Sequence, residues 1–206
     1  MLFVWYKVSF DEKWSHGSAV CETVYFFVEF VCVFPWKCVS LNNQNRGKIM
    51  DGILRKLPIG IQTFEKLREG DYLYVDKTAL VWRIASTETP YFLSRPRRFG
   101  KSLLLSTFEA YFEGKKELFE GLAIADMEKE WKTYPVFHLD LNAEKYDSPQ
   151  ALVEILSRQL TQWELKYGKG EDEETLSGRF AGVIRRACEQ SGRGVVVLVD
   201  EYDKPL

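Results

Sequence analysis

Two short polar motifs, each placed after an apolar segment, have the residue types of a site for a metal-bound phosphate. The first is a Gly-Lys-Ser tripeptide at positions 100–102, and the second is an Asp-Glu pair at positions 200–201. A bound polyphosphate needs backbone N–H groups at the start of a helix, an ammonium group, and a hydroxyl and a carboxylate that hold a divalent cation. Together the two motifs supply these groups.

The first motif follows the apolar segment 90–94 and an arginine-rich loop, and it opens a helical segment at 101–112. Gly100 allows the backbone to approach a phosphate closely. Lys101 would reach the β- and γ-phosphates as a catalytic cation, and Ser102 would ligate Mg²⁺. We expect seven consecutive residues to contact the nucleotide: Arg97, Arg98, Phe99, Gly100, Lys101, Ser102 and Leu103.

The loop departs from the consensus G-x-x-x-x-G-K-[ST] of a phosphate loop, because Arg95 stands where the first glycine belongs. Arg97 and Arg98 make the loop still more basic, and Pro96 restricts its backbone. Two alternatives to nucleotide binding therefore remain open at this point. The arginines could grip a nucleic-acid phosphate, or they could be solvated charges on an exposed loop.

The second motif ends the most hydrophobic segment of the chain, 194–199. Four or more apolar residues followed by an acidic pair are typical of a Walker B strand, in which Asp200 would hold Mg²⁺ opposite Ser102. Glu201 would position and deprotonate the attacking water as the general base of hydrolysis. A buried strand that runs into a charged turn is the alternative. The two motifs lie roughly 100 residues apart in the expected order, which favours ATP and Mg²⁺ as cofactors.

Beyond residue 50, strands alternate with helices, which predicts an α/β fold with a parallel sheet flanked by helices. Asp76 and Ser148 are typical of helix starts, and Pro149 suits a first helical turn. The predicted strands are 72–75, 90–94, 135–141 and 194–199, and the longer predicted helices are 63–69, 77–85, 101–112, 148–167 and 176–190. The carboxyl ends of the strands, where such sheets bind ligands, carry both motifs.

Residues 1–49 differ in composition from the rest of the chain. They contain eleven of the 30 aromatic residues and three of the four cysteines, without a steady helical or strand period. The apolar run 24–34 is about half of the ~20 residues that span a bilayer. Two interpretations remain: a membrane-interface or packing extension, or coding sequence upstream of the true start at Met50. We favour the second and expect the domain to occupy 50–206, with 1–49 outside it.

The composition excludes several classes of protein. With 206 residues, 46% of them hydrophobic, 28% charged and a net charge of −2, the chain is neither collagen-like, wholly disordered nor a polytopic membrane protein. The near-neutral charge argues against a nucleic-acid binder that uses its whole surface. Four cysteines without a CxxC pair predict neither a disulfide framework nor a zinc site. We expect a reduced, cytoplasmic protein without a membrane partner.

Four segments resemble the bacterial AAA-ATPase-like family: 59–65, 74–78, 91–102 and 198–205. The resemblance covers about 57–206, and it is specific because the sequence Arg-Pro-Arg-Arg-Phe-Gly-Lys-Ser at 95–102 characterises that family, including Arg95 in place of the first glycine. It implies a P-loop ATPase domain that binds ATP at Gly100, Lys101 and Ser102, with Asp200 and Glu201 as its carboxylates. Members commonly continue into a restriction-endonuclease-like nuclease domain, which implies nucleic acid as a partner of the longer protein.

The chain ends just past the acidic pair, so the resemblance also implies a fragment that is incomplete at its C-terminus. In additional-strand P-loop ATPases, the strand after Walker B inserts between the strands that carry the two motifs. We therefore expect 195–199 to have an unpaired or wrongly paired edge. We also expect the 206-residue chain to hydrolyse ATP poorly or not at all.

Three functions compete at this point. The chain could be an ATP-hydrolysing domain that switches a partner or effector, a module that binds nucleotide without hydrolysing it, or a binder of nucleic-acid phosphates through Arg95, Arg97 and Arg98. The sequence does not predict the oligomeric state or the biological process.

Overall fold

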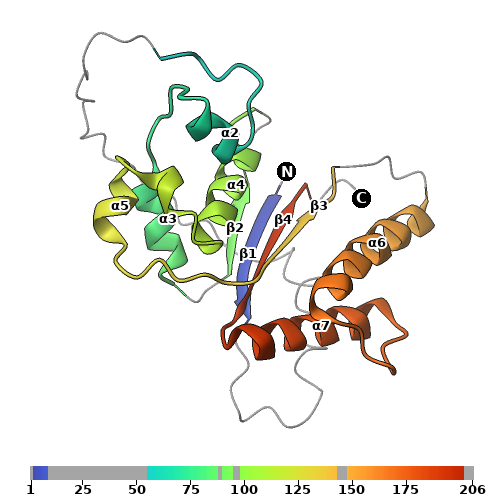
Figure 1. Cartoon of the computed structure of the whole chain (residues 1–206). Helices are drawn as coiled ribbons and strands as arrows, with labels where there is room; N and C mark the ends of the chain where they lie inside the picture. Colours follow the sequence, from blue (N-terminus) through green and yellow to red (C-terminus); the bar gives the residue numbers. More distant parts are fainter. Residues whose placement is uncertain (1, 9–54, 88–89, 95–97, 143–147, 202–206) are drawn as a thin grey trace.

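The computed structural model describes residues 2–8, 55–87, 90–94, 98–142 and 148–201 (Figure 1). The predicted start at Met50 and the apolar run 24–34 lie outside these residues. The elements in chain order are β1 (Leu2–Val8), α2 (Phe64–Glu69), α3 (Thr78–Ala85), β2 (Tyr91–Ser94), α4 (Lys101–Phe112), the 3₁₀ helix η2 (Lys116–Phe119), α5 (Ala123–Met127), β3 (Val136–Asp140), α6 (Pro149–Tyr167), α7 (Leu176–Ser191) and β4 (Val195–Asp200).

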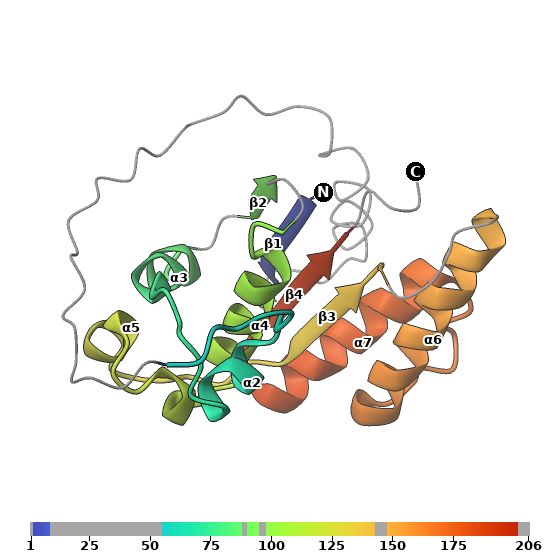
Figure 2. The ribbon, with the colours of Figure 1, turned by 90° about the horizontal axis from the view of Figure 1, so that it is seen from above.

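A four-stranded sheet in the order β2-β1-β4-β3 forms the middle layer. β3 and β4 are parallel, and β1 runs antiparallel to both of its neighbours, so β2 points in the same direction as β3 and β4. The helices α2 to α5 lie on one side of the sheet and α6 and α7 on the other (Figure 2). The architecture is thus α/β with helices on both faces, as predicted, but the sheet is mixed instead of wholly parallel.

β1 lies between β2, which precedes the first motif, and β4, which ends in the second motif. Its register places Val4 opposite Phe92 of β2 and opposite Val199 of β4. β4 therefore has a hydrogen-bonded neighbour on each side, so its edge is not unpaired, which was one of the two alternatives expected for 195–199. The pairing on this side is antiparallel. Sequence periodicity did not predict a strand here, because residues 2–8 carry neither a regular alternation nor turn signals at their ends.

The central strand β4 is buried along its whole length, as its uninterrupted apolar sequence predicted. Val196 and Leu198 pack into a core built mainly by α2 to α5, with the fully buried ring of Phe108 from α4. Val195, Val197 and Val199 point the opposite way, into the core beneath α6 and α7. Because the period of a strand is two, β4 joins both helical layers to one sheet.

Short polar side chains begin three of the helices; those of Asp76 and Ser148 were predicted, and that of Thr175 was not. The Asp76 carboxylate accepts the N–H of Thr78 at 2.8 Å, Ser148 Oγ accepts that of Ala151 at 3.3 Å, and Thr175 Oγ1 accepts that of Gly178 at 3.1 Å. Each bond satisfies a donor that the first helical turn leaves without a partner. Thr63 stands at the N-cap of α2 but makes no side-chain cap bond.

The predicted strand at 72–75 does not form. Tyr72 makes only an isolated bridge with Lys56, and Val75 is 71% exposed. Its aromatic and β-branched residues resemble those of a strand, but no neighbouring strand is available to pair with them.

A search of the described helices for a possible membrane span found none with the length and apolar character that crossing a membrane requires.

Two nearly buried ion pairs stabilise the α6–α7 hairpin. The guanidinium of Arg179 on α7 donates hydrogen bonds of 2.7 and 2.8 Å to the two carboxylate oxygens of Glu164 on α6. Arg186, which lies further along α7, donates hydrogen bonds of 2.5 and 2.9 Å to the two carboxylate oxygens of Glu173. Gly182 makes this second pair feasible, because a Cβ at this position would lie 1.7 Å from Glu173 Oε1.

These pairs predict a loss of stability in acid. The hydrogen bonds from Arg179 and Arg186 hold the pKa values of Glu164 and Glu173 below their ordinary value, although burial opposes the shift. A carboxyl group whose pKa is lower in the folded state stabilises the fold above its unfolded pKa, and that contribution is lost as the pH falls through the folded pKa. We therefore expect the free energy of unfolding to fall progressively below about pH 5.

Urea unfolding between about pH 7 and about pH 3 measures this loss. Glu173→Gln should be less stable at neutral pH and should show a shallower decline in acid. Its exposed neighbour offers a matched control, since Glu174→Gln should keep the wild-type profile. An unchanged decline in Glu173→Gln would show that the ion pair does not produce the pH dependence.

Candidate phosphate and metal site

Residues 98–100 form a turn that leads into α4. Gly100 is the N-cap of α4 and has a left-handed backbone, with φ 71° and ψ 30°. Arg98, two residues earlier, also has a positive φ of 67°. Arg98, Phe99 and Gly100 are exposed, and Phe99 has 62% of its surface accessible. The turn is thus open to solvent and could be approached by a ligand.

The two motifs meet at the start of α4. Ser102 Oγ donates a hydrogen bond of 2.7 Å to Asp200 Oδ2, across 98 positions of the chain. Asp200 is only 5% exposed, and its second oxygen, Oδ1, is buried without a hydrogen-bond partner among the described residues. A buried carboxylate oxygen without a donor is costly, and in native proteins such an atom often marks an ion or a water site.

Lys101 and Glu201 flank this contact and are nearly buried, at 5% and 6% exposure. Lys101 is the first residue of α4, directly after Gly100, whose carbonyl accepts the N–H of Leu104 at 3.0 Å. Glu201 directly follows β4 and has a positive φ of 56°. Leu103, the third residue of α4, is partly buried against the core of α2 to α5, and Arg97 lies outside the described residues.

Backbone strain is concentrated at this site. Four described non-glycine residues have a positive φ: Asp71, Arg98, Trp131 and Glu201. Two of them lie at this site: Arg98 is in the turn before the first motif, and Glu201 is in the second motif. A left-handed backbone costs a non-glycine residue about 1 kcal/mol or more, and such strain recurs where a functional geometry must be held.

β3 brings a further carboxylate to the same edge of the sheet. Asp140 stands directly beside Asp200 in the parallel register, and the N–H of Leu141 donates to the Asp200 carbonyl at 3.1 Å. Asp140 is exposed and accepts the N–H of Asn142 at 2.8 Å. Within the described ranges, no group of three or more histidine, cysteine or acidic residues is arranged to hold a metal ion on its own.

Sequence analysis missed a pair that joins α4 to β3 beneath Asp200. His138 Nδ1 lies 3.0 Å from Glu109 Oε2. Burial alone would lower the pKa of His138, but the hydrogen bond and charge of Glu109, with the charges of Asp140 and Asp200, outweigh it and raise this pKa. The protonated ring then donates from Nδ1 to the carboxylate. The sequence shows only that His138 and Asp140 share a face, because α4 and β3 are distant in the chain.

Replacing Gly100 with alanine should lower both the stability of the fold and the affinity for nucleotide. The left-handed backbone at φ 71° would cost the alanine about 1 kcal/mol of stability. Gly121 is a matched control, because it has φ 73° and a Cβ added there would likewise meet no atom within 4 Å. Both variants should lose similar stability in urea unfolding, whereas only Gly100→Ala should weaken nucleotide binding. Equal nucleotide affinities in the two variants would argue against a role for the Gly100 turn.

Comparison with known proteins places the sequence in a family. The sequence model of a family described as "Predicted AAA-ATPase" matches residues 58–206. The chain belongs to this AAA-ATPase-like family. Residues 1–57, which include β1, lie outside the match.

A curated relative of this AAA-ATPase-like chain is an uncharacterised protein encoded in the vnfD 5′ region of Azotobacter chroococcum mcd 1. The two are 44% identical over 153 residues, which is 74% of this chain and 30% of that protein. The chain thus spans less than a third of the length of this relative. No solved structure matches the chain.

Proposed function

We propose that this chain binds ATP with Mg²⁺ as the P-loop domain of an AAA-like ATPase. The observation that carries the proposal is the 2.7 Å hydrogen bond between Ser102 Oγ and Asp200 Oδ2. In P-loop NTPases, a serine or threonine hydroxyl and a Walker B aspartate hold the same Mg²⁺ ion. In this chain the same two residue types are already in contact, at the N-terminus of a helix that follows an exposed turn.

The donors around this contact suit a hard cation and a polyphosphate. Hydroxyl and carboxylate oxygens are the ligands that Mg²⁺ prefers, together with substrate phosphates and water. The unpartnered Oδ1 of Asp200 leaves one carboxylate oxygen available for such an ion or its water shell. Magnesium would supply charge neutralisation between the phosphates. Ser102 and Asp200 would hold it, and backbone N–H groups at the start of α4 would face the phosphate oxygens.

Lys101 and Glu201 take the remaining roles in this proposal. The Lys101 ammonium would stabilise negative charge on the β- and γ-phosphates, and Arg97, Arg98, Phe99, Gly100 and Leu103 would complete the binding turn. Glu201 would orient a water and accept its proton during hydrolysis.

We propose that hydrolysis belongs to a longer parent protein in the cytoplasm, and that the 206-residue chain alone is slow or inactive. A nuclease domain of that parent would account for nucleic acid as a partner.

Binding of a labelled, non-hydrolysable ATP analogue with and without Mg²⁺ tests this proposal. We expect saturable binding that Mg²⁺ strengthens and that a duplex DNA competitor leaves unchanged. DNA affinity that falls steeply with salt and does not respond to ATP would instead support the binding of nucleic-acid phosphates through the arginine-rich loop. Turnover of ATP by the 206-residue chain at a typical enzymatic rate would contradict the proposed dependence on a longer parent.

A further inference from the structure

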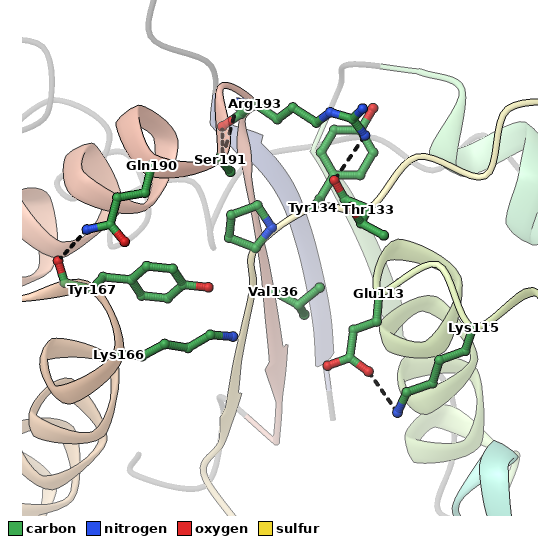
Figure 3. Close-up of a pocket in the computed structure, with 11 residues that line it drawn as sticks. Glu113, Lys115, Thr133, Tyr134, Val136, Lys166, Tyr167, Gln190, Ser191 and Arg193 are labelled. Atoms are coloured by element: carbon green, nitrogen blue, oxygen red, sulfur yellow. Dashed lines mark hydrogen bonds and ion pairs between the residues drawn. The ribbon is translucent and has the colours of Figure 1, made fainter.

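A polar cavity of about 640 Å³ lies at the end of the sheet opposite the phosphate and metal site (Figure 3). Its floor is formed by Pro135 and Val136, where β3 begins, whereas Asp200 lies at the far end of β4. Its walls come from the segments after α4 and before β3, the last turns of α6 and α7, and the turn that leads into β4. The other lining residues are Glu113, Lys115, Thr133, Tyr134, Lys166, Tyr167, Gln190, Ser191 and Arg193.

Two cations, each placed over a tyrosine ring, line this cavity from different elements. Lys166 Nζ of α6 lies 5.1 Å from the centre of the Tyr167 ring, and the Arg193 guanidinium lies 5.7 Å from the centre of the Tyr134 ring. In the described part of the chain, neither cation has a carboxylate within ion-pair distance. The third cation, Lys115, differs because it is paired with Glu113 at 2.9 Å and with Glu65 at 3.1 Å.

The Arg193 side chain is held in place by hydrogen bonds within the protein. Arg193 Nη1 donates to the Thr133 carbonyl at 3.1 Å, and the Arg193 N–H donates to Ser191 Oγ at 3.2 Å. Lys166 and Tyr167 extend from α6 into the space that faces Glu113 and Lys115 (Figure 3). The Tyr167 hydroxyl has no hydrogen-bond partner among the residues that the structure describes, so a donor is available beside the Lys166 ammonium.

We propose that this cavity binds a small phosphorylated molecule. Two unneutralised cations and a hydroxyl donor around one hollow suit a doubly charged oxyanion, since guanidinium and ammonium groups make their strongest hydrogen bonds to such groups. The volume of about 640 Å³ lies within the usual range of small-molecule sites. The tyrosine rings offer flat surfaces to the body of the ligand. This proposal does not depend on nucleotide binding, because none of the residues in the phosphate turn lines the cavity.

Titration of the full chain with inorganic phosphate and with ribose 5-phosphate, followed by NMR at low ionic strength, tests the proposal. The titration uses the Lys101→Ala background, so that the phosphate turn does not bind the probes. We expect saturable shifts at Lys166, Tyr167 and Arg193. Lys166→Gln should weaken binding at least ~10-fold, and Tyr167→Phe should weaken it less.

Lys169→Gln is the matched control, because Lys169 is an exposed lysine three residues away that does not line the cavity. It should leave the affinity unchanged. Since Lys166 is also exposed, its replacement should not prevent folding, which the dispersion of the NMR spectrum verifies. The proposal is overturned by non-saturable shifts, by shifts confined to residues 98–103, or by equal affinities in Lys166→Gln and Lys169→Gln.

Discussion

Lys101→Met weakens binding of the ATP analogue at least ~100-fold in our account, because the ammonium is the principal cation of the proposed phosphate turn. Removing one partner of a desolvated, charge-paired contact typically costs 2–5 kcal/mol, and about 2.8 kcal/mol corresponds to a factor of 100. Methionine retains most of the apolar volume of this side chain, which is 5% exposed. The measurement is the dissociation constant in the presence of Mg²⁺.

An exposed lysine provides the control for this variant. Lys116→Met lies in η2, which follows the opposite end of α4, and should bind the analogue as the wild type does. Urea unfolding of both variants separates lost affinity from lost stability. An unchanged affinity in a folded Lys101→Met protein would remove Lys101 from the phosphate site.

The second large effect is expected in the α6–α7 hairpin. Arg179→Ala should destabilise the fold by about 3–5 kcal/mol, because Glu164 would remain as a buried carboxylate without its partner. The two side chains are 12% and 6% exposed. Arg179 Nη1 also donates to Ser157 Oγ at 2.7 Å and Nη2 to Thr161 Oγ1 at 3.0 Å, so the substitution removes further hydrogen bonds between the two helices. The midpoint and slope of urea unfolding measure the change.

Two companion variants make the interpretation specific. Arg185→Ala, on the same helix, removes a side chain that is 59% exposed and 3.9 Å from Glu173, so it should cost less than about 0.5 kcal/mol. Replacing both members of the buried pair by methionine should recover much of the loss, since no unpaired charge remains. If Arg179→Ala and Arg185→Ala were equally stable, the pair would not stabilise the hairpin.

The elements most accurately predicted from sequence are those with strong local signals. α4 begins at Lys101 and ends at Phe112 as expected, because Gly100 allows the turn before it and a glycine follows it. The buried character of β4 followed from five successive apolar residues. The contact between Ser102 and Asp200 followed from the order of two motifs on adjoining elements, although neither motif alone was specific.

The features that sequence reasoning missed depend on tertiary contacts. The strand expected at 72–75 required a pairing partner that the fold does not offer. The strand Leu2–Val8 has its partners at positions 91–94 and 195–199, so local periodicity could not reveal it. The pairing of His138 with Glu109 requires α4 to pack across β3. Each of these features depends on residues that are distant in the sequence.

The same distinction applies to the cavity at the start of β3. Its cations come from three separate segments, and no spacing in the sequence brings Lys166 and Arg193 together. By contrast, the candidate phosphate and metal site draws its residues from two continuous motifs. Sites made of continuous motifs are therefore visible in the sequence, whereas a site assembled from helix ends needs the structure.

The most direct test of a shared metal site is a double-mutant cycle on the dependence of nucleotide affinity on Mg²⁺. The quantity measured is the ratio of ATP-analogue affinities with and without Mg²⁺, in the wild type, Ser102→Ala, Asp200→Asn and the double variant. If both side chains hold one ion, Mg²⁺ strengthens binding at least ~10-fold in the wild type, each single variant loses most of this factor, and the double variant loses little more. Independent losses that add up, or a wild-type affinity that does not respond to Mg²⁺, would contradict the account.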